Sequence, residues 1–271
     1  MRRSRIEDNP TELEAVEDED TWTLFQWPGT VHCDSLYVRC TKLQRVLGLL
    51  KVDYKLKNIS FPQGMDKAKI EKRIAPLMRK IPILQVGNKM IQDTNEIFNY
   101  IVKENEFEGF IIKDSVKYAN SYFIKHFVEH WMVWLVVYAR FVQETNYKRF
   151  IKTLLDVNNT DFIMHSINYT RDRAIMFLKN TEVGNFDHTA YLEAYACSLA
   201  VLDRMLDSQD YLIDDTIQEC DLSVFMCMQA FYDPAFIEES TIARGYKNLT
   251  AWFLRVEAET LNDNTRRPSF K

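Results

Sequence analysis

A chain of 271 residues is long enough for one large domain or two small domains, each with its own core. Its net charge of −5 gives no electrostatic basis for binding nucleic acid, and its most apolar run, from Trp131 to Ala139, is too short to span a bilayer. A hydrophobic content of 46% with only 7 glycines and 7 prolines is typical of a globular, helix-rich protein. The 5 cysteines form no C-x-x-C pair, which favours reduced thiols in the cytosol.

Residues 1–21 are predicted to form a disordered acidic tail. A few arginines at the start are followed by a dense run of acidic residues between Glu7 and Asp20. The segment carries too few apolar side chains to offset the entropy lost on ordering. The folded part is therefore expected to begin at Trp22.

Residues 22–105 show the pattern of a small mixed sheet with helices. An aromatic strand from Trp22 ends at a Pro-Gly turn, and apolar residues then recur at helical spacing between Leu36 and Leu50. An alternating segment, 52–59, predicts a second strand, which must run parallel to the first. After a charged segment, 65–79, the pattern predicts two further strands and a helix from Thr94. This order is the thioredoxin topology, with a four-stranded mixed sheet.

The segment from Lys80 to Thr94 is the most informative part of the sequence. Pro82 opens an apolar strand, a tight turn follows, and the next strand ends at Asp93. Because proline lacks an N–H group, its position at the start of a strand predicts a fixed loop, often with a cis bond. Asp93 and Thr94 are residue types that begin helices by capping free N–H groups.

Residues 112–262 have a helical hydrophobic period throughout, and no strand pattern interrupts it. The predicted helices cover residues 114–143, 146–155, 161–179, 191–205, 221–231 and 246–259. The two parts together predict a helix-rich α+β fold, with a thioredoxin-like domain followed by an all-helical domain. This is the architecture of glutathione transferases.

Several short motifs, spread in order over residues 22–260, resemble those of metaxins and failed-axon-connections proteins. The motifs are Cys40 to Tyr54, Glu129-His130-Trp131 with Trp134 and Tyr138, Val183 to Phe186, Glu219 to Phe225, and Tyr246 to Glu257. The sequence departs from the family pattern at three points. Gly48 lies inside a helix, Gln218 replaces the usual Ser or Thr cap, and Gly184 stands alone where two glycines are usual.

The resemblance to glutathione transferases implies a glutathione site. The backbone of Ile81, beside Pro82, would pair with the cysteinyl backbone of the tripeptide. Asp93 and Thr94 fall where that family places an acidic residue and a serine. Both features suit the γ-glutamyl end of glutathione. Its ammonium can donate to the Asp93 carboxylate, and its carboxylate is attracted to the N-terminus of the helix. Both residues also serve as ordinary caps of the following helix.

The group that would activate the glutathione thiol is less well defined by the sequence. The position that holds the catalytic Cys or Ser in related thiol transferases falls on Tyr37, whose hydroxyl could stabilise a thiolate. Tyr37 could equally fill the interface between the two domains. Cys33, in the loop before the helix, is the alternative thiol, and Cys40 is predicted to be a buried small hydrophobe.

The segment from His126 to His130 spells H-x-x-E-H, the inverted pattern of some zinc proteases. The surrounding helix is rich in aromatic residues and begins the all-helical part. We interpret the segment as a packed, partly polar helix face and predict no metal site. Trp131, Trp134 and Tyr138 are predicted to belong to the core.

Two functions remain open on the sequence. One is an adaptor of the metaxin or failed-axon-connections type that binds protein partners, with the fold retained and catalysis weak or lost. The other is a glutathione-dependent transferase in detoxification or stress response. With no apolar leader or tail anchor visible, we expect a cytoplasmic protein that reaches the mitochondrial outer membrane only through a partner. A homodimer is possible for this fold.

Overall fold

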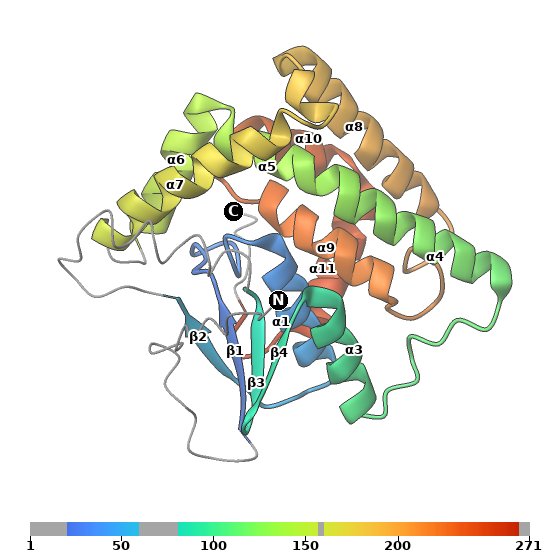
Figure 1. Ribbon diagram of the computed structural model, residues 1–271. Coiled ribbons are helices and arrows are strands. Elements are labelled where there is room, and N and C mark those ends of the chain that lie inside the picture. The colour runs from blue at the N-terminus through green and yellow to red at the C-terminus, as the bar shows by residue number, and fades with distance from the viewer. Residues whose placement is uncertain (1–20, 60–80, 157–159, 266–271) are drawn as a thin grey trace, which may run out of the picture.

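The computed structural model describes residues 21–59, 81–156 and 160–265 of the chain (Figure 1). It begins with a four-stranded sheet in the order β2-β1-β3-β4. The strands are β1 (Trp22–Gln26), β2 (Lys55–Asn58), β3 (Ile83–Val86) and β4 (Lys89–Gln92). β1 runs parallel to β2 and antiparallel to β3, and β3 forms a hairpin with β4. The predicted mixed sheet is confirmed, while the acidic tail up to residue 20 and the charged segment 65–79 lie outside the described residues.

Helix α1 (Val38–Leu49) lies between the sheet and the helical part of the molecule (Figure 1). It packs against α3 (Thr94–Glu104) and against α9 (Glu219–Phe231) and α11 (Lys247–Thr260) of the second part. Every residue from Val38 to Gly48 except Arg39 is buried. The sequence indicates one apolar face, but the polar side chains of this helix are buried as well because neighbours cover it on several sides.

The second part is entirely helical within the described residues, so the predicted α+β class is confirmed. Besides α9 and α11, its helices are α4 (Ser115–Phe127), α5 (Val133–Phe141), α6 (Glu144–Leu155), α7 (Thr160–Leu178), α8 (His188–Met205) and α10 (Ile237–Gly245), with a short 3-10 turn, η2 (Val183–Asn185). A π-helical turn, η1 (Val128–Met132), interrupts the single helix predicted over 114–143. The sequence pattern misses α10, because the buried Glu239 breaks its apolar period. None of the described helices is both long enough and apolar enough to cross a membrane.

Two glycines that stand out in the sequence occupy close contacts. A Cβ atom at Gly48 would lie 2.1 Å from the carbonyl oxygen of Thr260, at the end of α11. A Cβ atom at Gly184 would lie 2.1 Å from the carbonyl oxygen of Leu178. The cost of a glycine inside α1 is therefore offset by the close approach of another segment.

Residues 261–265, which we call the C-terminal strap, cross from α11 onto the first part of the chain. Asn262 donates its Nδ2 to the carbonyl oxygen of Gln44 at 3.2 Å, and its Oδ1 accepts from the hydroxyl of Tyr54 at 3.4 Å. Asn264 donates its Nδ2 to the carbonyl oxygen of Tyr54 at 3.0 Å. The last described residues thus tie the helical part to the sheet part.

At the start of α9, Asp221 supplies the N3 carboxylate of a capping box whose N-cap residue is Gln218. The Asp221 carboxylate accepts the Gln218 N–H at 2.9 Å, the Leu212 N–H at 3.0 Å and the Trp252 Nε1–H at 2.8 Å. Burial raises the pKa of Asp221 to about 6 even though these three donors oppose the rise. Asp221 therefore satisfies the backbone N–H of Gln218, although Gln218 is not the usual Ser or Thr.

Candidate functional site

The β3–β4 hairpin brings the two halves of the predicted glutathione site together. Ile83 at the start of β3 pairs with Gln92 at the end of β4. Pro82 and Asp93, one residue further on, therefore flank the same end of the hairpin. The Ile81–Pro82 bond is cis, as the sequence predicts, and both residues are buried.

Asp93 is the N-cap of α3, which confirms its predicted capping role. Its Oδ1 accepts the N–H of Asn95 at 2.9 Å and the N–H of Glu96 at 3.3 Å. Its backbone φ of 73° is unusual for a residue other than glycine and costs on the order of 1–3 kcal/mol. Strain of this kind clusters at active sites, ligand clamps and switch regions. Asp93 is exposed, whereas the neighbouring Thr94 is buried.

Tyr37 occupies the N-cap position of α1, where its backbone N–H donates to Ser35 Oγ at 3.2 Å. Burial raises the pKa of Tyr37 above its ordinary value; Arg39 opposes the rise, and the negative charges of Asp93 and Glu129 add to it. Asp93 and Glu129 therefore lie within electrostatic reach of the Tyr37 hydroxyl. The phenol stays protonated at neutral pH and can donate a hydrogen bond, but the acidic neighbours disfavour an additional negative charge beside it.

The two cysteines nearest to Tyr37 are buried thiols. Cys33 donates from Sγ to the carbonyl oxygen of Ser35 at 3.2 Å, and Arg140 Nη2 lies 3.3 Å from the same sulfur. Burial outweighs the attraction of Arg140 and raises the pKa of Cys33 to about 11, while burial raises that of Cys40 to about 12. A thiol protonated at neutral pH is a poor nucleophile, so Cys33 is not a good substitute for Tyr37. The prediction that Cys40 is buried is confirmed.

An ionic cluster that the sequence did not predict lies between the two parts of the chain, next to this site. Lys42 of α1 is fully buried, and its Nζ lies 2.8 Å from Glu129 Oε1 and 2.7 Å from Glu219 Oε1. Lys125 shares Glu219 at 2.5 Å, and the Lys42 ammonium also lies over the Phe98 ring. Sequence gives little signal for this cluster, because each charge by itself is typical of an exposed helix face.

The carboxylates of this ionic cluster stay charged in the folded protein. Burial by itself would raise the pKa values of Glu129 and Glu219, but the attraction and hydrogen bonding of Lys42 and Lys125 hold both below their ordinary value. Ser223 also donates its hydroxyl to Glu129 Oε1 at 3.1 Å. The cluster therefore joins α1, η1 and α9 through full charges.

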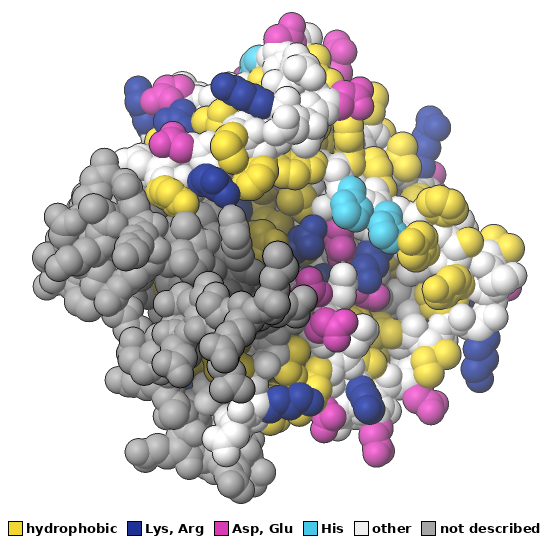
Figure 2. Space-filling view, viewed as in Figure 1, with side chains coloured by type: hydrophobic (Ala, Val, Ile, Leu, Met, Phe, Trp, Pro, Cys, Tyr) yellow, Lys and Arg dark blue, Asp and Glu magenta, His cyan; other side chains and the backbone are white. Residues whose placement is uncertain are grey.

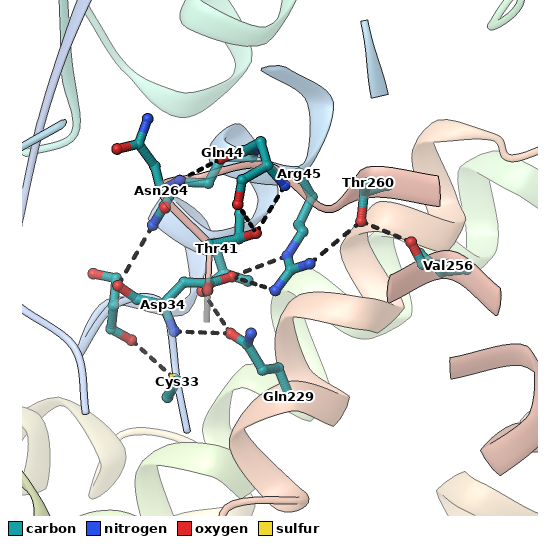
Figure 3. Close-up of polar contacts among 12 residues, drawn as sticks. Cys33, Asp34, Thr41, Gln44, Arg45, Gln229, Val256, Thr260 and Asn264 are labelled. Atoms are coloured by element: carbon teal, nitrogen blue, oxygen red, sulfur yellow. Dashed lines mark hydrogen bonds and ion pairs between the residues drawn. The ribbon is translucent and has the colours of Figure 1, made fainter. Parts of the chain in front are cut away.

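A second buried ion pair fixes the loop that leads to Tyr37 (Figure 3). Arg45 donates its Nε to Asp34 Oδ2 at 3.0 Å, and neither side chain is exposed. The Asp34 N–H donates to Gln229 Oε1 of α9 at 3.1 Å, and Arg45 Nη1 reaches Thr260 Oγ1 of α11 at 3.5 Å. The position of Tyr37 consequently depends on how the helical part docks.

The H-x-x-E-H segment does not bring its three side chains to one point. Glu129 is engaged by Lys42 and Ser223 on the buried side, whereas His130 is exposed. No group of three or more His, Cys, Asp or Glu side chains suited to a metal ion occurs in the part of the chain that the structure describes. Of the predicted aromatic core residues, Tyr138 is buried and the two tryptophans are partly buried against the core.

The protein has the glutathione-transferase fold. Four features define it: the sheet order, the cis proline before β3, the strained residue after β4 and the all-helical second part. No protein-family model and no curated protein sequence matches this chain. Similarity is found among solved structures.

Three solved structures share this fold with a TM-score of 0.56 each. The β-etherase LigF from Sphingobium sp. strain SYK-6 is 19% identical, covering 88% of this chain and 95% of its own. The apo form of human glutathione-S-transferase T1-1 is 14% identical, covering 90% and 85%. FzlA from C. crescentus is 11% identical, covering 92% and 96%. At sequence identities this low, the structural similarity shows the fold of the chain and nothing finer.

Proposed function

We propose that this protein binds glutathione weakly and has slow or no transferase activity, acting as an adaptor of the metaxin or failed-axon-connections type. The observation that carries the proposal is the juxtaposition of Pro82 with the strained Asp93, within electrostatic reach of Tyr37. The low catalytic activity follows from the environment of Tyr37 and from the burial of the nearby thiols.

The binding step is supported by the chemistry at the end of the hairpin. One oxygen of the Asp93 carboxylate caps α3, which leaves the other oxygen to accept from the ammonium of a γ-glutamyl group. Thr94, in the first turn of α3, would offer its hydroxyl and the positive end of the helix to the adjacent carboxylate. The backbone of Ile81 would pair with the cysteinyl residue.

Weak catalysis is supported by the electrostatics around the tyrosine. A transferase must lower the pKa of the glutathione thiol, and positive charge or several donors are needed for this. Tyr37 offers one donor, while Asp93 and Glu129 lie within electrostatic reach of it. Lys42 is the nearest buried cation to Glu129 and is already shared by two carboxylates.

The adaptor role is supported by an exposed apolar surface on α4. Large apolar or aromatic side chains lie exposed there, namely Val116, Tyr118, Tyr122, Phe123 and Phe127. Exposed patches of this kind mark interaction sites for proteins. A protein partner or a second copy of the chain would cover this patch, and attachment to the mitochondrial outer membrane would come through such a partner.

Titration calorimetry of glutathione into the full chain tests the binding step. Asp93→Ala should abolish the weak binding, because it removes both the carboxylate and the cap. Asp114→Ala is the matched control, since Asp114 caps α4 through the N–H groups of Val116 and Lys117. Each variant should lose about 1 kcal/mol of stability through its cap, so only the glutathione affinity separates them. Equal affinities in wild type and Asp93→Ala would refute the site.

The alternative function, a glutathione-dependent transferase, is favoured by the intact Pro82 and Asp93-Thr94 arrangement. It is tested by turnover of an aromatic electrophile such as a chlorodinitrobenzene with saturating glutathione. Tight binding, together with turnover that disappears in Tyr37→Phe, would establish catalysis and overturn the adaptor proposal.

A further inference from the structure

Two histidines one helical turn apart lie together on the surface of the helical part. The rings of His126, at the end of α4, and His130, in η1, have centroids 5.3 Å apart and planes only 11° from parallel. His130 is exposed and His126 is half-buried. Two neighbouring histidine side chains are visible over α4 in Figure 2. The other face of His126 lies against Tyr122, at a centroid distance of 4.1 Å.

These two imidazoles differ from another exposed histidine of the chain. The His188 ring nitrogens are engaged by Gln143 at 2.8 Å and by Glu238 at 2.9 Å. Neither the His126 nor the His130 imidazole hydrogen-bonds to another residue in the described part of the chain. Both rings therefore keep a nitrogen available for another ligand.

We propose that His126 and His130 form a two-histidine chelate for a divalent transition-metal ion such as Ni²⁺, Cu²⁺ or Zn²⁺. Imidazole is a preferred ligand of all three ions, with metal–nitrogen distances of about 2.0–2.1 Å. Two nitrogens on one ion lie about 3–3.4 Å apart at such distances, and the two rings can turn toward one ion because the χ2 torsion of histidine is broad. Water or an exogenous ligand fills the remaining positions, because no third protein ligand lies beside the pair among the described residues.

The backbone that carries the pair is fixed. α4, η1 and α5 follow one another without a loop, and Arg39 of α1 donates to the Glu129 carbonyl oxygen inside η1 at 3.4 Å. Single π-helical turns are often found at functional sites. The Glu129 side chain is held on the buried side by Lys42, so it neither blocks the two rings nor adds a negative charge to them.

This proposal is independent of glutathione binding, and Ni²⁺ titration of the full, tag-free chain tests it. The wild-type chain should bind one Ni²⁺ ion. His130→Ala, at an exposed position where the fold is retained, should weaken binding about 100-fold, because the second ligand bond is an intramolecular one. His126→Ala should have the same effect, and the double variant, which keeps neither ligand, should bind Ni²⁺ no more tightly than either single variant.

His188→Ala is the matched control and should leave Ni²⁺ affinity unchanged. With Cu²⁺, electron paramagnetic resonance should show coupling to two nitrogens in the wild type and to one in His130→Ala. Ni²⁺ affinity that is unmeasurable in the wild type, or unchanged in His130→Ala, would overturn the proposal.

Discussion

Replacing Lys42 by methionine tests how the two parts of the chain are held together. Methionine keeps most of the side-chain volume but removes the fully buried ammonium that lies 2.8 Å from Glu129 and 2.7 Å from Glu219. Glu219 keeps Lys125 as a partner. Glu129, with a side chain only 9% exposed, keeps the Ser223 hydroxyl and has no second ion pair among the described residues.

The expected loss of folding stability depends on Glu129, the carboxylate that is left without its cation. Removing one partner of a buried ion pair costs about 3–5 kcal/mol, and because Lys125 still neutralises Glu219 we expect about 3 kcal/mol for Lys42→Met. The double variant Lys42→Met/Glu129→Gln removes both charges and should recover to within about 1 kcal/mol of wild type, as neutral replacements of buried pairs often do. Lys125→Ala, at a partly exposed pair, should cost about 1 kcal/mol or less.

The assay is urea unfolding at neutral pH and again in acid. The pKa values of Glu129 and Glu219 are depressed in the folded state, so their stabilisation is present above the ordinary value of 4.5 and is lost as the pH falls through the depressed values. The difference between wild type and Lys42→Met should shrink accordingly. A Lys42→Met variant within about 1 kcal/mol of wild type at neutral pH, or a double variant less stable than the single one, would refute this account of the ionic cluster.

Two further predictions concern packing and a buried acid. Gly48→Ala should lower the melting temperature, because the added Cβ would lie 2.1 Å from the Thr260 carbonyl oxygen, even though alanine is the better helix former by about 1 kcal/mol. Gly245 has open space around it, so Gly245→Ala should be neutral or stabilising. Equal changes in melting temperature for the two variants would contradict the close contact at Gly48. Because burial raises the pKa of Asp221 from 3.8 to about 6, its contribution to stability should fall by about 3 kcal/mol as the pH rises through this range. Asp221→Asn should flatten that part of the pH profile of unfolding, and an unchanged slope would show that Asp221 does not cause it.

The elements that local chemistry specifies could be predicted from the sequence. The Pro82 strand start, the hairpin and the Asp93 cap depend on residues within about a dozen positions of one another, and all three occur in the structure. The order of the strands and of most helices follows from the hydrophobic period. These features were enough to define the fold and to bring the candidate glutathione residues to one end of the hairpin.

The parts that depend on contacts between distant segments could not be predicted. Lys42 and Arg45 look like the polar side of a helix, yet both are buried by helices more than 80 positions away along the chain. The π-helical turn at η1 has no sequence pattern that would predict it. Glu239 interrupts the apolar pattern of α10, although its side chain is buried and accepts hydrogen bonds from Asn146 and Tyr191. Charge in the sequence therefore predicts exposure only where no second layer covers the helix.

The C-terminal strap has a consequence for the way the chain is made. Helix α1 and Tyr54 leave the ribosome about 200 residues before Asn262 and Asn264, which hydrogen-bond to them. Until the strap emerges, the Gln44 and Tyr54 carbonyl groups lack these partners and α1 lacks the covering of α9 and α11. The amino-terminal sheet thus reaches its final packing only after Asn264 has been synthesised, and the nascent chain exposes one flank of α1 until α9 and α11 emerge.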